Sequence, residues 1–243
     1  MEIKKNIALL IRINWVKTIY FNFKKFPFKV AKKLPVFFYG KVKFQDISGS
    51  INITAPICTG MIQFGLQYEM ATVSKNIAEI MIAGIVEFKG YAQFGKDVFL
   101  YVGKQAYAQF GNMTGLASNT QFICVEKITL GNYARFGADS QIMDSHFHPM
   151  INTLTKIAYP VNGKIEIGNY NYVSSRVTIM PNTKTPDFCT VASNSLCNKD
   201  YDGFGQNILI GGIPAKLLKE NTTRDWDTEI PLLEKWLLLK IYL

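Results

Sequence analysis

The chain has 243 residues, of which 48% are hydrophobic, and this is enough for one buried core with modest extensions. Its four cysteines stand far apart, without the spacing of a disulfide framework or a structural zinc site, so we expect a reducing, cytoplasmic compartment. No apolar run approaches the roughly 18 residues of a bilayer-spanning helix, and we expect no secretory signal.

The net charge of +9 comes from the first part of the chain. Residues 1–43 contain eleven lysines and arginines but one acidic residue, Glu2, and aromatic and aliphatic residues lie between the bases. Two interpretations of this basic amphipathic segment remain open. It either contacts an anionic membrane peripherally or forms a helical cap that packs its aromatic residues on the main domain. Nucleic acid is not an expected partner, because no recognisable binding module accompanies the charge.

After Pro35, short runs of Val, Ile and Phe alternate with Gly, Asn and Ser, which predicts short strands and tight turns. Residues 40–127 predict degenerate coils of a repeat structure, because an apolar–Gly step recurs in them. This step is found at Phe94-Gly95, Val102-Gly103 and Phe110-Gly111.

From Leu130 onward the repeat becomes regular, with an apolar or small residue at every sixth position. The residues in phase are Leu130, Phe136 and Ile142, and then Ile167, Val173, Ile179, Thr185, Val191 and Cys197. Small residues follow four places after several of them, at Ala134, Ser140, Thr183, Cys189 and Ser195. Hexapeptide repeats predict a β-helix in which three units make one triangular coil and the residues in phase stack inside it.

The pattern divides the chain into three parts. We assign residues 1–43 to the N-terminal segment, 44–218 to the β-helix with a loop insertion at 143–166, and 219–243 to a C-terminal helical extension. Pro231 is expected to open the helix of this extension, which is apolar enough to pack on the coils or on a neighbouring subunit.

Residues 128–218 resemble the hexapeptide-repeat acyltransferases, a family that includes maltose, galactoside and polysaccharide-biosynthesis O-acetyltransferases. The resemblance rests on 167–182, on the closing Gly212-Ile-Pro-Ala-Lys216, and on 142–149, which is similar to the segment of the catalytic histidine. It implies a mainly β fold, the left-handed parallel β-helix, and a homotrimer. It also implies an O-acyltransferase that moves an acyl group, in the first instance acetyl, from acetyl-CoA to a hydroxyl of a saccharide or lipid-linked glycan precursor.

The two histidines of the chain, His146 and His148, both lie in the insertion. The resemblance assigns His148 as the general base for the acceptor hydroxyl, because a neutral imidazole can take a proton at physiological pH. His146 stands where many relatives have an acidic residue, and its role stays open. If 144–148 is extended, Asp144 lies on the same side as both histidines. It would then orient an imidazole or, alternatively, bond its own backbone in a turn.

The resemblance also places acetyl-CoA along the coils. Small and aromatic side chains would line its pantetheine arm, and lysines would contact its phosphates. The expected contacts are Tyr172, Ser174, Ala192, Ser193, Lys199, Pro214 and Lys216.

Two other functions remain possible from the sequence. Because the repeats are imperfect, the β-helix could be a noncatalytic scaffold. A metal-dependent β-helix enzyme of the carbonic-anhydrase type would need three histidines, whereas this chain has two, so no metal is expected.

Overall fold

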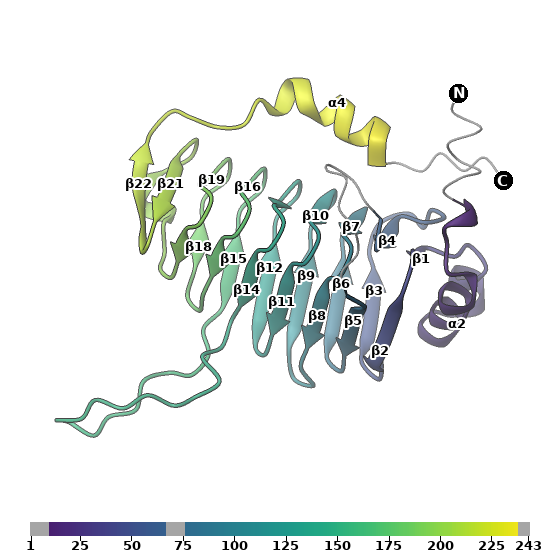
Figure 1. Ribbon diagram of the computed structural model, residues 1–243, viewed down its shortest axis with the longest axis horizontal. Coiled ribbons are helices and arrows are strands. Elements are labelled where there is room, and N and C mark those ends of the chain that lie inside the picture. The colour runs from purple at the N-terminus through teal and green to yellow at the C-terminus, as the bar shows by residue number, and fades with distance from the viewer. Residues whose placement is uncertain (1–9, 67–75, 238–243) are drawn as a thin grey trace.

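Short strands wind the chain into a triangular prism (Figure 1). The computed structural model describes residues 10–66 and 76–237. Successive strands enter three sheets in turn, so that three strands make one coil and each strand pairs in parallel with strands one coil away. Among the described strands the exception is β22, which pairs antiparallel with β21. The predicted parallel β-helix is confirmed.

The first sheet contains, in spatial order, β1 (Val36–Phe38), β4 (Ile62–Phe64), β7 (Ala92–Phe94), β10 (Thr114–Leu116), β13 (Arg135–Phe136), β16 (Tyr172–Val173), β19 (Thr190–Val191), β21 (Leu209–Gly212) and β22 (Ala215–Lys219). The second contains β2 (Val42–Asp46), β5 (Ala78–Ile82), β8 (Phe99–Val102), β11 (Gln121–Cys124), β14 (Gln141–Met143), β17 (Thr178–Ile179) and β20 (Leu196–Cys197). The third contains β3 (Ser50–Ile53), β6 (Ile85–Phe88), β9 (Tyr107–Phe110), β12 (Lys127–Leu130), β15 (Ile165–Ile167) and β18 (Lys184–Thr185).

The described helices are α2 (Trp15–Lys25), α3 (Phe28–Ala31), a 3₁₀ turn (Asp202–Phe204) and α4 (Trp226–Leu237). Within the described ranges, no helix combines the length and hydropathy needed to cross a membrane.

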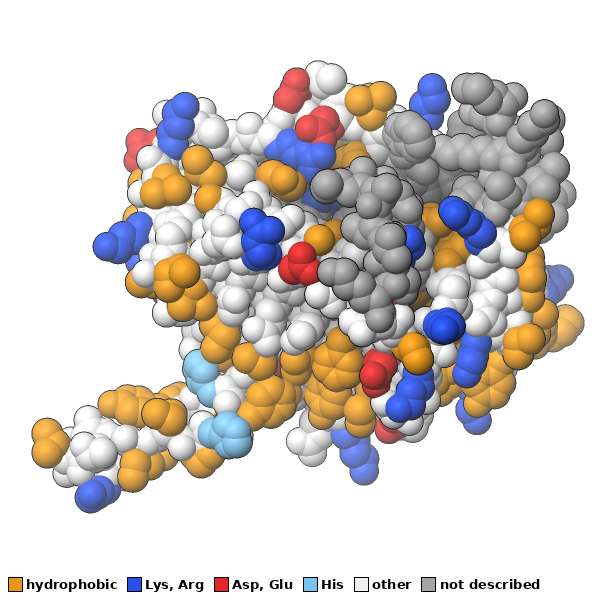
Figure 2. Space-filling view, viewed as in Figure 1, with side chains coloured by type: hydrophobic (Ala, Val, Ile, Leu, Met, Phe, Trp, Pro, Cys, Tyr) orange, Lys and Arg blue, Asp and Glu red, His pale blue; other side chains and the backbone are white. Residues whose placement is uncertain are grey.

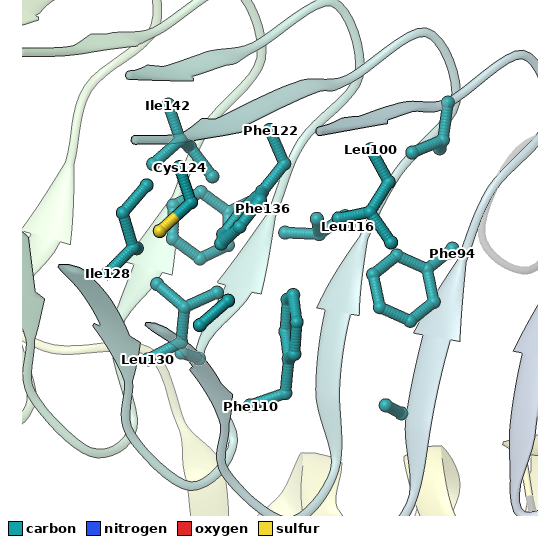
Figure 3. Close-up of a cluster of buried hydrophobic side chains, with 14 of the residues drawn as sticks. Phe94, Leu100, Phe110, Leu116, Phe122, Cys124, Ile128, Leu130, Phe136 and Ile142 are labelled. Atoms are coloured by element: carbon teal, nitrogen blue, oxygen red, sulfur yellow. The ribbon is translucent and has the colours of Figure 1, made fainter. Parts of the chain in front are cut away.

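The residues that recur at every sixth position lie in the interior of the prism. These residues, from Leu130 to Cys197, are all buried, as are the small residues four places later. Figure 3 shows apolar side chains from the three sheets meeting along the interior. In the earlier coils aromatic rings extend this ladder, and Phe64 stacks on Phe94 with ring centroids 4.2 Å apart. These ladders bury the apolar surface that no single coil could bury alone.

Coil length explains why the repeat is irregular before Leu130. Phe122 pairs with Leu100 and with Ile142, which are 22 and 20 residues away in the chain. In the last coils Ile179 pairs with Cys197, 18 residues away, and this is three hexapeptides. The early coils are therefore complete coils whose extra residues shift the sequence phase from one circuit to the next.

Helix α2 covers the open edge of the first coil. The fully buried Asn22 donates from Nδ2 to the Val36 carbonyl at 2.7 Å and accepts at Oδ1 from the Val36 amide at 3.1 Å. Thr18 Oγ1 accepts from the Phe38 amide at 3.1 Å, and Phe21 packs on the Phe38 ring. An uncovered strand edge would leave these backbone groups unpaired, so the contacts support the cap interpretation of the N-terminal segment.

The first coil begins earlier than the sequence pattern indicates. Strand β1 lies inside residues 1–43, which the sequence assigns to the segment before the β-helix. Cutting the chain after residue 43 would remove both α2 and β1. Residues 10–43 are thus part of the folded domain.

Helix α4 lies along the outside of the prism, over an edge formed by aromatic rings (Figure 1). Trp226 is buried there, edge-on to Tyr133 and Tyr170, whose own rings stack at 5.2 Å. Tyr133 also donates a hydrogen bond to Glu234 at 2.7 Å. Trp226 and Leu233 of the C-terminal extension are therefore packed on the coils, one of the two places expected for this extension.

This helix begins at Trp226 and not at Pro231, which lies inside it. Asp225 Oδ1 accepts a hydrogen bond from the Thr228 amide at 3.2 Å, and bonding to Thr228 lowers the pKa of the Asp225 carboxyl. A side-chain acceptor at this position satisfies an amide of the first turn and so defines the start of the helix.

Candidate active site

A hairpin arm leaves the prism between β14 and β15, where the second and third sheets meet (Figure 1). We call residues 145–162 the arm. Its two sides pair antiparallel at Ser145 with Asn162 and at Ile151 with Ala158. The arm takes the place of a turn between two strands of one coil, and this is why the six-residue phase breaks here.

His146 and His148 lie exposed at the base of the arm (Figure 2). The backbone turns sharply between them, because Phe147 has a φ of +58° and the His148 amide donates to the His146 carbonyl at 2.7 Å. Ser145 Oγ accepts from the Phe147 amide at 3.0 Å and holds this turn. The segment is therefore a turn and not an extended strand, so strand alternation does not decide where the two imidazoles point.

Asp144 is fully buried and bonds to the backbone of the preceding coil. Its Oδ1 accepts from the Val125 amide at 2.7 Å, and its Oδ2 accepts from the amides of Glu126 and Lys127, each at 2.8 Å. The Asp144 carbonyl accepts from the Gly163 amide at 2.9 Å. Among the described residues no hydrogen bond joins this carboxylate to either imidazole. Its contacts hold the base of the arm against the prism.

Three of the four cysteines are buried in the core. Burial raises the pKa of Cys124, which lies with Sγ 3.6 Å from Asp144 Oδ2. Burial also raises the pKa of Cys189 and of Cys197 to about 12, so these thiols stay protonated at neutral pH. In the part of the chain that the structure describes, no three His, Cys, Asp or Glu side chains are grouped to hold a metal ion.

Three residues expected along the acyl-CoA path lie together at a second edge, where the first and second sheets meet. The Ser174 amide donates to the Val191 carbonyl at 3.0 Å, and the Ala192 amide donates to the Ile210 carbonyl at 2.9 Å. Ser174 and Ala192 therefore occupy equivalent places in successive coils. Ser193, next to Ala192, is exposed. We call this the serine edge.

The β21–β22 hairpin extends the serine edge. Ser195 Oγ accepts from the Gly212 amide at 3.0 Å and fixes the hairpin against the preceding coil. A Cβ on Gly211 would lie 2.8 Å from the Ala192 Cβ, so this close approach requires glycine. The hairpin carries two further residues expected to contact acetyl-CoA, the exposed Pro214 and Lys216.

The remaining two expected contacts lie elsewhere. Tyr172 is on β16 beneath Arg224, whose guanidinium carbon is 4.8 Å from the ring centroid. Lys199 follows β20 on the edge that carries the arm, with Nζ 5.5 Å from the Tyr201 ring. The structure does not group either side chain with the serine edge.

Within one chain, the histidines and the serine edge are on different edges of the prism. The second sheet separates them, because Ser174 precedes its strand β17 in the chain whereas the arm follows its strand β14. One chain by itself therefore does not place His148 beside Ser193.

Two residues that organise these edges were not recognised from the sequence as part of the site. Ser195 stands at a small-residue position of the repeat, which signals packing but not its bond to the hairpin. Ser145 directly follows Asp144, and only the turn at Phe147 gives its hydroxyl a partner.

Comparison with known proteins finds similarity to O-acetyltransferases. No family model matches the chain. It is 26% identical over 140 residues to the galactoside O-acetyltransferase of Escherichia coli, a match that covers 58% of this chain and 62% of that enzyme. The chain thus spans less than two thirds of that relative. It is also 26% identical over 163 residues to the galactoside O-acetyltransferase of Lactococcus lactis, covering 67% and 72% of the two chains.

Among solved structures, the polysialic acid O-acetyltransferase OatWY aligns with a TM-score of 0.50 and 19% identity, over 79% of this chain and 98% of that chain. At this identity the likeness concerns the fold. In fold this chain is a left-handed parallel β-helix of the kind found in hexapeptide-repeat acetyltransferases, and in sequence it resembles the galactoside O-acetyltransferases. Both agree with the family resemblance of its motifs.

Proposed function

We propose that this protein is an O-acyltransferase that moves an acetyl group from acetyl-CoA to a hydroxyl of a saccharide or glycan precursor. The observation that carries the proposal is the arm. A β-helix similar to that of O-acetyltransferases places both histidines of the chain, exposed, at the base of one projecting loop.

The arm has to supply only a base for the acceptor hydroxyl, because a thioester is already activated toward attack. The imidazole of His148 takes the proton of the acceptor hydroxyl while its oxygen bonds to the acyl carbon. The carbon–sulfur bond then breaks, and the proton passes from the imidazolium to the departing thiolate. This is direct transfer, and it uses no serine or cysteine nucleophile.

A saccharide acceptor follows from the relatives, whose names describe acetylation of galactosides and of polysialic acid. The purified full chain, incubated with acetyl-CoA, should release free CoA only when a suitable hydroxyl acceptor is present. A panel of galactosides, nucleotide sugars and oligosaccharides, read by thiol release and by the mass of the acetylated product, identifies the acceptor. Failure of the whole panel, together with failure to bind acetyl-CoA, would favour the noncatalytic scaffold.

We further propose that the active unit is a homotrimer with sites shared between neighbouring subunits. The serine edge, with Pro214 and Lys216, would bind acetyl-CoA, and the arm of a neighbour would bring its His148 to the thioester. The separation of the two edges within one chain supports this arrangement, because a second copy can supply the missing half.

Light scattering should therefore report three chains under active conditions, and two inactive variants should complement each other. His148→Asn removes the base, and Ser193→Trp obstructs the serine edge at an exposed position. Each site needs an intact serine edge from one chain and an intact His148 from its neighbour, and in an equal mixture each of these is present in half of the sites. Co-refolded mixed oligomers should therefore recover roughly a quarter of wild-type activity. Mixtures that stay inactive, although both variants assemble, would exclude shared sites.

A further inference from the structure

The cap helices leave an apolar and basic surface that neither the core nor the site uses. We call it the cap surface. It consists of Ile11, Val16, Ile19, Phe23, Phe28, Lys24, Lys29, Lys32 and Lys33, all of them exposed. Figure 2 shows orange and blue side chains interspersed at the end of the molecule where Figure 1 places α2.

Packing explains which face of α2 remains free. Thr18, Phe21 and Asn22 are buried against the first coil, so the opposite side of the helix faces outward. Val16 is 79% exposed on that side, and Phe28 at the start of α3 is 70% exposed. Water contact with large apolar side chains gathered on one short helix pair is unfavourable, and such patches commonly mark an interaction surface.

The lysines of the cap differ in what they do. Lys25 Nζ donates to the carbonyls of Ile47 and Gly49 and so closes the first coil. Lys17 lies over the Phe44 ring at 4.9 Å. The four lysines of the cap surface have no such contacts with the described residues and point their charge outward.

The positive charge of the cap favours an anionic partner. Residues 10–43 contain no aspartate or glutamate, so no acid neutralises the exposed lysines from within the cap. Exposed Trp15 and Tyr20 add amphipathic rings to the same helix. Lysines pair with anionic headgroups, apolar side chains enter the boundary below them, and Trp and Tyr favour that interface.

We propose that the cap surface docks on an anionic phospholipid membrane, with α2 lying in the plane of the headgroups. The β-helix axis then points away from the membrane, because α2 covers the end of the prism. From β2 to β14 there are four strand spacings, so the histidines stand on the order of 20 Å beyond the cap.

This height also bears on the acceptor, an inference that rests on the proposed transferase function. A hydroxyl modified there belongs to a glycan that extends well above the membrane surface, as a lipid-linked oligosaccharide does. A soluble monosaccharide acceptor would gain nothing from the docking.

The test uses the full chain and vesicle flotation, with phosphatidylglycerol–phosphatidylcholine vesicles against pure phosphatidylcholine. The chain should float with the anionic vesicles and be released as salt rises. Lys24→Glu, Lys29→Glu and Lys33→Glu combined should weaken binding at least about 100-fold, because each lost lysine removes about 1 kcal/mol and each new glutamate adds repulsion. Ile19→Ser with Phe23→Ser should weaken it at any salt concentration, since it removes the apolar contribution.

The matched control is Lys89→Glu, Lys104→Glu and Lys156→Glu, three exposed lysines outside the cap that change the net charge equally. Circular dichroism melting verifies that each variant is folded. Equal loss of binding in both triple variants would show a general charge effect and overturn the proposal, as would equal flotation with neutral vesicles or none at all. Soluble-substrate turnover in the cap variant stays at the wild-type level, so failure of docking is distinguishable from failure of the transferase.

Discussion

Replacing His148 with Asn is expected to lower turnover on the order of 10²–10⁴-fold, the range that a positioned general base contributes. Asn keeps a polar side chain of similar size but takes no proton near neutral pH. The residue is exposed at the base of the arm, outside the core ladders, so folding should be unchanged. Steady-state kinetics should show the loss in kcat, while the affinity for acetyl-CoA, measured by calorimetry, changes little.

His146→Asn is the matched control, because His146 lies in the same turn and is also exposed. Its loss should be smaller than that of His148→Asn. An inactive His146 variant beside a nearly normal His148 variant would move the base to His146. Full activity in both variants would exclude a histidine as the general base, since the chain contains no other histidine.

Replacing Asp144 with Ala is expected to cost about 3 kcal/mol of unfolding free energy and to reduce kcat on the order of 10²-fold. The carboxylate accepts hydrogen bonds from three backbone amides in a fully buried place. Removing it leaves three amides without their acceptor. A donor left unsatisfied costs about 1–3 kcal/mol, and because these bonds are only partly buried the lower end applies to each of them. The base of the arm is then no longer fixed, and His148 loses its place relative to the acceptor.

Denaturant unfolding and kinetics at a temperature where the variant is folded separate the two effects. Asp227→Ala, at an exposed position in α4, is the control for loss of a carboxylate. Ser145→Ala is the milder companion, because it removes only the hydroxyl that holds the Phe147 amide, and it should lower kcat with little loss of stability. Wild-type kcat in both Asp144→Ala and Ser145→Ala would show that the arm needs neither contact to place its histidines.

The sequence by itself determined the regular half of the fold and the location of the chemistry. In the coils after Leu130 each circuit has three six-residue units, so inward-facing positions recur with a constant period and can be read without coordinates. The break in that period marked the arm, and the two histidines of the chain fall within it. Both features depend on neighbours in the sequence, and this is why a single sequence reveals them.

Contacts between residues distant in the chain were decided only by the tertiary structure. Turns of unequal length hide the early coils, because stacking aligns Phe122 with Leu100 whatever the number of residues between them. The role of Asp144 depends on amides about one coil earlier, and that of Asn22 on the free edge of β1. No local sequence pattern predicts such partners, because the partner of a buried polar side chain depends on which backbone groups are left unpaired in the folded chain.

The relation between the two halves of the site is likewise a product of the winding. Ser174 follows His148 by 26 residues, and successive sheets of the prism carry the two to different edges. A sequence records order along the chain, whereas a β-helix turns that order into position around an axis. For this reason the candidate catalytic and acetyl-CoA-binding residues could be named from the sequence, whereas their separation on two edges of the prism could not be predicted from it.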